Sequence, residues 1–121
     1  MKKIMTLFFA IALSGAANAQ FANTSWKGQF NIPDATDMIL QFKTDTLQLT
    51  YPDNTPLETM SYKISNDTLT VRKLDGQSEC SYDQYATYKI FMKDKKLFIA
   101  PINDDCSIRL GACPSDGMEK M

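Results

Sequence analysis

The sequence contains no histidine, and this absence excludes several kinds of catalytic site. Histidine is the commonest general base in enzymes and the commonest protein ligand of transition metals. Serine or cysteine nucleophiles that depend on histidine are therefore excluded. The five glycines are scattered and form no phosphate-binding loop, and the three cysteines lack the spacing of a four-ligand zinc site. We expect no catalytic residue, no cofactor and no metal.

Carboxylates remain as candidate catalysts, because a pair of acids can hydrolyse a glycoside without histidine. The only adjacent acidic pair is Asp104 and Asp105. Neighbouring residues on a strand point to opposite faces, so these two carboxylates would not share one site. We interpret them as loop carboxylates and predict that the protein is not an enzyme.

The N-terminal segment has the layout of a secretory signal. Lys2 and Lys3 precede an apolar run over residues 4–13, and small residues end at Ala19. The run is too short for a membrane-spanning helix, which needs roughly 20 residues. We predict that residues 1–19 are a signal peptide cleaved after Ala19. The mature protein would be periplasmic or secreted, without a membrane span.

Residues 20–121 are long enough for a single domain. They carry 11 basic and 14 acidic residues, because the predicted signal takes two of the 13 basic residues and no acidic one. The resulting charge of −3 and the lack of a basic run give no indication of a nucleic-acid partner. We expect a monomer.

Alternation of apolar and polar residues dominates the chain after the signal. Three segments share one pattern, in which an apolar residue is followed by four polar residues and another apolar residue. They are residues 42–47, 64–69 and 92–97. Period-two alternation is typical of half-buried strands, and the Asp and Asn residues between them suit turns. We predict three hairpins in which the first and last residue of each segment face each other.

Further strands are expected around residues 25–32 and 106–110, which gives about eight strands in hairpin order. The edges of such a sheet must be hidden. We therefore predict an all-β fold, a small antiparallel up-and-down β-barrel of about eight strands. A two-sheet β-sandwich is the alternative. The tail over residues 114–121 is expected to be frayed.

Three cysteines leave one thiol unpaired. Cys80 and Cys106 flank the base of the last hairpin, so we favour a disulfide between them. A bridge from Cys106 to Cys113 would close a short loop and is the alternative. In the favoured pairing, Cys113 is a free thiol near the tail.

Two short motifs resemble the pattern of small bacterial lipocalin-like (calycin-type) domains. They are Trp26-Lys27-Gly28 on the first strand and Asp105-Cys106-Ser107-Ile108-Arg109 near the last strand. The resemblance implies that Trp26 packs across the closed end of the barrel and that Arg109 covers its ring in a cation–π pair. Thr24 stands where the usual lipocalin start has glycine.

The inward-facing aromatic and methionine side chains indicate a site for a small apolar molecule with a polar group. An ordinary packed core is the competing interpretation. The candidate ligand-binding residues are Phe42, Tyr51, Tyr62, Tyr88 and Met92.

The alternative function is binding of an unidentified envelope protein, as an inhibitor or assembly factor. Loops at residues 52–56 or 75–83 could form that surface. Phe91 and Phe98 could also form it, because they lie opposite each other on the outer face of the last predicted hairpin.

Overall fold

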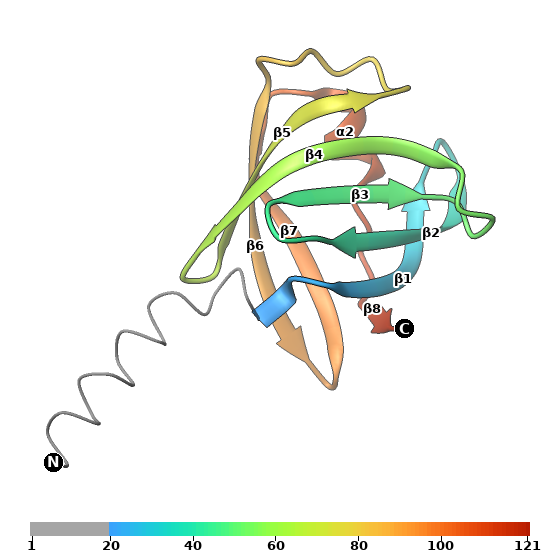
Figure 1. Cartoon of the computed structure of the whole chain (residues 1–121), viewed down its shortest axis with the longest axis vertical. Coiled ribbons are helices and arrows are strands. Elements are labelled where there is room, and N and C mark those ends of the chain that lie inside the picture. The colour runs from blue at the N-terminus through green and yellow to red at the C-terminus, as the bar shows by residue number, and fades with distance from the viewer. Residues whose placement is uncertain (1–19) are drawn as a thin grey trace, which may run out of the picture.

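The computed structural model describes residues 20–121, which fold into one closed antiparallel β-barrel (Figure 1). The predicted signal peptide lies outside the described residues. Each strand pairs with the next in chain order, and the last pairs with the first. The elements are β1 (Thr24–Asn31), β2 (Ala35–Phe42), β3 (Thr46–Thr50), β4 (Pro56–Ser65), β5 (Thr68–Gly76), β6 (Tyr85–Lys93), β7 (Lys96–Asp104), α2 (Ser107–Ala112) and β8 (Met118–Lys120).

This architecture confirms the predicted barrel rather than the sandwich. The pairings form a complete ring through all eight strands, in which the short β8 pairs with two residues of β1 and two residues of β7. No helix within residues 20–121 is long and apolar enough to cross a membrane.

The three predicted hairpins have the predicted register. The paired residues are Phe42 with Leu47, Ile64 with Leu69, and Met92 with Leu97. This register turns the apolar positions of the strands toward the interior. At the third hairpin, Asp94 and Lys95 both have positive φ, as the primed turn of a two-residue hairpin loop requires.

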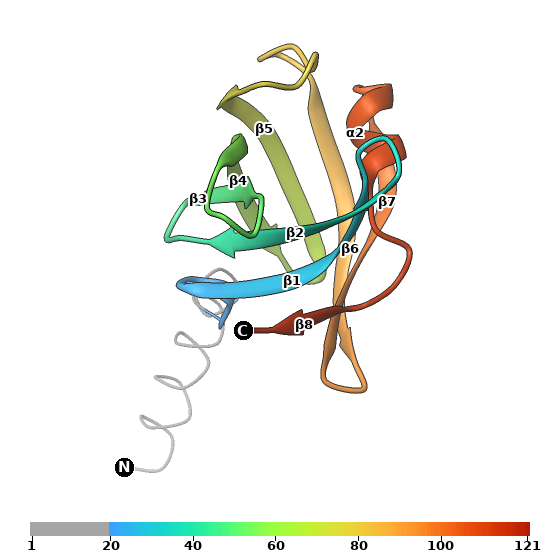
Figure 2. The ribbon, with the colours of Figure 1, turned by 90° about the vertical axis from the view of Figure 1, so that its right-hand side faces the viewer.

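Met92 does not lie in the interior, contrary to the prediction. Its side chain is 43% exposed, whereas Leu97 opposite it is fully buried. Figure 2 shows that the β6–β7 hairpin extends beyond the neighbouring strands. No opposite wall of the barrel covers Met92 there, while Leu97 also pairs with Met118 on β8.

The end of the chain differs from the prediction in two ways. The expected strand at residues 106–110 is the short helix α2, and the tail expected to be frayed contains β8. β8 pairs with both β1 and β7 and so closes the barrel. Met118 is fully buried and lies against Gly28, where an added Cβ would be only 2.4 Å from Met118 Cγ.

Aromatic side chains fill one end of the barrel. Phe21 packs against Trp26 and Phe42, with ring centroids 6.4 and 5.5 Å apart. Phe42 meets Tyr62 edge to face at 5.3 Å, a favourable arrangement of aromatic rings. All four side chains are buried, and Trp26 Nε1 donates a hydrogen bond to Thr24 Oγ1 at 2.9 Å. This end is therefore closed by a packed core.

We predict that Met118→Ala lowers the free energy of unfolding by about 2–5 kcal/mol, because it removes a buried side chain from the closing strand. Met121→Ala is the matched control, since Met121 is 66% exposed only three residues away. Urea unfolding followed by circular dichroism measures both. Equal stability of the two variants would contradict a closing role for β8.

Candidate functional site

The opposite end of the barrel is hollowed by a cavity of about 530 Å³. It lies where β1, β3 and β5 end and where β2, β4 and β6 begin. The aromatic cluster instead lies near the start of β1 and the end of β2. The walls of this mouth cavity are formed by Asn31, Ile32, Pro33, Leu49, Leu57, Glu58, Met60, Gln77, Ser78, Glu79, Cys80, Ser107, Ile108, Arg109, Gly111 and Ala112.

A second, much smaller cavity of about 70 Å³ lies among core residues that include Leu69, Val71 and Tyr88. Its walls share Leu49, Met60, Arg109 and Ala112 with the mouth cavity, so the two adjoin each other. Small-molecule sites usually measure about 300–1,000 Å³, so the inner space alone is too small for such a ligand. Space for a ligand is therefore at the mouth.

None of the five predicted ligand-binding residues lines the mouth cavity. Phe42 and Tyr62 belong to the aromatic cluster at the closed end, and Tyr88 lines the inner cavity. Tyr51 is half-buried against the core, and Met92 is exposed at the hairpin tip. Alternation predicts which side of a strand faces inward, but it does not give the height of a residue along the barrel.

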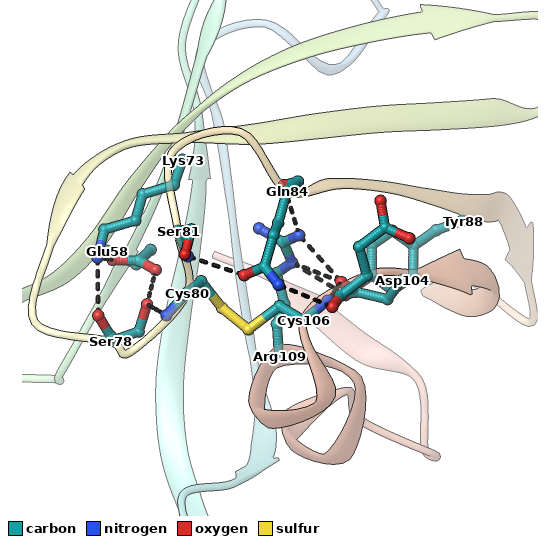
Figure 3. Close-up of a disulfide and its surroundings, with 11 residues drawn as sticks. Glu58, Lys73, Ser78, Cys80, Ser81, Gln84, Tyr88, Asp104, Cys106 and Arg109 are labelled. Carbon is teal, nitrogen blue, oxygen red and sulfur yellow. Dashed lines mark hydrogen bonds and ion pairs between the residues drawn. A yellow bond between two sulfur atoms is a disulfide. The ribbon is translucent and has the colours of Figure 1, made fainter.

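The predicted disulfide is confirmed. Cys80 and Cys106 are bonded, with an S–S distance of 2.05 Å and a sequence separation of 26. Figure 3 shows the bond joining the loop after β5 to the start of α2. Both segments line the mouth cavity. The disulfide therefore ties two walls of the cavity together, and such a bond typically stabilises a fold by about 2–4 kcal/mol.

Asp104 is not a loop carboxylate, contrary to the prediction. It ends β7, and its side chain is fully buried. Its carboxylate accepts hydrogen bonds from Arg109 Nε at 2.9 Å, from the backbone N–H of Cys106 at 2.8 Å and from the Tyr88 hydroxyl. Burial and this hydrogen bond raise the pKa of Tyr88, so the phenol stays protonated. Asp105, in contrast, is exposed.

Arg109 does not cover Trp26, contrary to the lipocalin-like expectation. Its guanidinium lies on Asp104 and also donates from Nη2 to the carbonyl of Gln84 at 2.9 Å (Figure 3). Arg109 lies on α2, at the mouth, whereas Trp26 belongs to the aromatic cluster at the closed end. The helix therefore places these two side chains at different ends of the barrel.

A buried ion pair at the mouth was not predicted. Lys73 Nζ lies 3.8 Å from Glu58 Oε1, and both side chains are buried. Lys73 also donates to the carbonyl of Ser78 at 2.7 Å, and the Ser78 hydroxyl donates to Glu58 Oε2. Gly76 has φ of +143°, and a Cβ there would collide with Glu58 Oε1. Glycine at this position therefore makes room for the carboxylate.

The sequence did carry a signal for this pair. Glu58 has the same alternation phase as Met60 and Tyr62 on β4, and Lys73 the same phase as Val71 on β5. Charged residues at inward-facing positions need a partner when buried. That pattern could have identified both residues.

Cys113 is free, as expected, but it is half-buried rather than exposed in a frayed tail. It lines the inner cavity, and its thiol lies 3.5 Å from the carbonyl of Ile99. Burial raises the pKa of the thiol to about 11, and the negative charge of Asp104 adds to the shift. The thiol is therefore neutral and weakly nucleophilic near neutral pH.

Phe91 and Phe98 stack on the outer face of the β6–β7 hairpin, with ring centroids 5.3 Å apart. Both are half-buried. Lys89 Nζ lies 5.7 Å from the Phe91 ring, and Phe98 packs so closely on Gly117 that a Cβ there would be 2.8 Å from its ring. The C-terminal segment therefore covers part of this pair.

No family model matches the chain, and comparisons with curated proteins and with solved structures found no significant match. The closed antiparallel barrel of eight strands is compatible with a lipocalin-like fold. Function must therefore be argued from the geometry of the mouth cavity.

We predict that Asp104→Asn lowers the free energy of unfolding by about 3–5 kcal/mol, because it leaves the largely buried guanidinium of Arg109 without its counter-charge. Asp105→Asn alters the exposed neighbouring carboxylate and should have little effect. Urea unfolding of the two variants tests this. The same small change in both would show that Asp104 does not hold α2.

We also predict that native Cys113 becomes reactive only at high pH. Because its pKa is raised to about 11, alkylation by iodoacetamide should still be accelerating at about pH 10. In urea-unfolded protein the rate should level off above the ordinary cysteine pKa of about 8.5. Near-UV circular dichroism at each pH confirms that the native sample is folded. If the alkylation rate depends on pH in the same way in native and unfolded protein, the pKa of Cys113 is not raised.

Proposed function

We propose that this protein is an exported, non-enzymatic, lipocalin-like binding protein that holds a small, mostly apolar molecule in the mouth cavity. The observation that carries the proposal is the cavity itself. Its volume of about 530 Å³ lies within the usual range of about 300–1,000 Å³ for small-molecule sites. Its apolar walls with a few polar groups also match the usual composition of such sites.

The construction of the walls supports the proposal. The Cys80–Cys106 bond and the Asp104–Arg109 pair hold α2 against the barrel before any ligand arrives. A preformed wall lowers the entropy lost on binding. The disulfide is also consistent with an extracellular or periplasmic location, which agrees with the signal-like N-terminus.

Binding of an envelope protein is the second candidate. It is favoured by the stacked, half-buried pair of Phe91 and Phe98 and by the exposed Met92 at the tip of the same hairpin. Together these residues place apolar surface on the outside of the barrel. This surface is separate from the mouth cavity, so the two candidates can be tested independently.

The test uses the neutral apolar dye N-phenyl-1-naphthylamine, whose fluorescence rises in an apolar site. We expect the protein to bind it and Ile108→Glu to weaken binding about tenfold, because Ile108 lines the cavity. Leu110→Glu is the matched control. Leu110 lies on the same helix at similar exposure, 42% against 47%, but does not line the cavity.

Absence of dye binding by the unmodified protein would overturn the proposal, as would equal loss in the two α2 variants. Phe91→Ala and Phe98→Ala should leave dye binding unchanged. If they abolish it instead, the dye reports the outer face of the hairpin and the second candidate gains support.

A further inference from the structure

The outer face of the β6–β7 hairpin combines aromatic and basic side chains. Phe91 pairs with Phe98 across the two strands. The next outward-facing pair toward the tip is Lys93 with Lys96. Lys89 lies on the other side of the rings, two residues before Phe91, with Nζ 5.7 Å from the centroid of the Phe91 ring. Lysines therefore flank the stacked rings on both sides.

The pairing of Lys93 with Lys96 is unfavourable for the hairpin by itself. Like charges directly opposite each other destabilise a pair of strands. Lys96 Nζ lies 4.0 Å from Glu119 Oε1, but the two side chains are 48% and 75% exposed, and such exposed ion pairs contribute little. Choices that disfavour the fold are expected at functional or strained sites. An anionic partner would relieve the repulsion between these two lysines.

The tip of the hairpin is both basic and apolar. Residues 89–98 contain four lysines and one acidic residue, Asp94, and all five are exposed. Met92, next to Lys93, is 43% exposed. The adjoining segments, residues 63–67 and 116–120, contain two lysines and three acidic residues, so the excess of positive charge is confined to the hairpin. Figure 2 shows that this tip projects, so a flat surface would meet it before the neighbouring strands.

Charge is distributed unevenly between the two ends of the barrel. The loops at the mouth, residues 32–34, 51–55 and 77–84, contain four acidic residues and no lysine or arginine. β6 has nine residues, so its two ends lie roughly 25–30 Å apart. That distance is about three times the screening length of about 8 Å at physiological ionic strength. The acidic mouth is therefore largely screened from an anion at the hairpin tip.

We propose that the β6–β7 hairpin docks on an anionic lipid bilayer, with the lysines at the lipid phosphates and Met92 entering the interface. Basic and apolar side chains together are typical of segments that lie on anionic membranes. Lysine is instead depleted in protein–protein interfaces, so a lipid surface fits the hairpin better than an acidic protein does. The mouth cavity, at the other end of the barrel, would face away from the lipid.

The test measures how residues 20–121 sediment with sucrose-loaded vesicles. These residues form the closed barrel without the predicted signal peptide. We expect them to bind phosphatidylcholine vesicles that contain about 30 mol% phosphatidylglycerol, and to bind pure phosphatidylcholine at least about tenfold more weakly. Added salt should weaken binding to the anionic vesicles, because it screens the lysines.

A matched pair of charge reversals locates the contact. Lys93→Glu and Lys43→Glu change the net charge equally, and both lysines are exposed, but Lys43 lies in the turn after β2. We expect Lys93→Glu to weaken binding about twenty-five-fold, because each charge near an anionic surface contributes about fivefold, and Lys43→Glu to weaken it about threefold at most. Lys93→Glu also places an opposite charge across from Lys96, so it should not unfold the hairpin.

A second pair of variants examines the apolar contact. Met92→Gln keeps the charge and nearly the size of the side chain, so a loss of about fivefold would report that this side chain leaves water. Met121→Gln is the control, because Met121 is also exposed, at 66%, but lies outside the hairpin. Circular dichroism checks that each variant is folded.

Three results would overturn the proposal. The first is no binding to the anionic vesicles at low salt, which would leave an envelope protein as the candidate partner of this face. The second is equal binding to both kinds of vesicle. The third is an equal loss in the Lys93 and Lys43 variants, which would show that net charge, rather than the hairpin, controls binding. Unchanged binding of Met92→Gln would overturn the insertion of Met92. None of these results bears on the mouth cavity, which the dye tests separately.

Discussion

The buried carboxylate of Asp104 holds together the segment that forms part of the cavity wall and connects to β8, the strand that closes the barrel. It lies where β7 ends, and it binds Arg109 on α2 and the backbone N–H of Cys106. The disulfide fixes the same turn to the loop after β5. Five residues separate α2 from β8, so these contacts hold the chain close to the point where Met118 enters the interior. The cavity wall and the segment that leads to the closing strand therefore share one set of contacts.

The two ends of the barrel are built from different chemistry. At the closed end, Phe21, Trp26, Phe42 and Tyr62 fill the space with rings that satisfy their polar atoms locally. At the mouth, inward-facing positions carry charge instead, and Glu58 forms a buried ion pair. Burying such a pair costs desolvation energy that apolar residues would not cost. Departures from the apolar pattern are expected at functional or strained sites.

The position of the cavity also explains why none of the ligand-binding residues predicted from the sequence lines it. Phe42, Tyr62 and Tyr88 do point inward, as the alternation indicates, but the first two lie in the filled end. The hairpin register was predictable because a slip by one residue would expose every apolar side chain on a strand. The Cys80–Cys106 pairing was predictable because both residues flank the base of one hairpin. The alternation of apolar and polar residues does not show how far along the barrel axis a residue lies.

By itself, the sequence determined the strand alternation, the hairpin register, the need for closure and the favoured cysteine pair. Each of these follows from local periodicity or from the spacing of residues that flank a hairpin. Only the tertiary structure decided that residues 107–112 form a helix and that residues 118–120 form the closing strand. Segments this short carry too little periodicity to choose a conformation. Their conformation is set by partners outside each segment, namely the Asp104 carboxylate and the disulfide to Cys80 for α2 and the edges of β1 and β7 for β8.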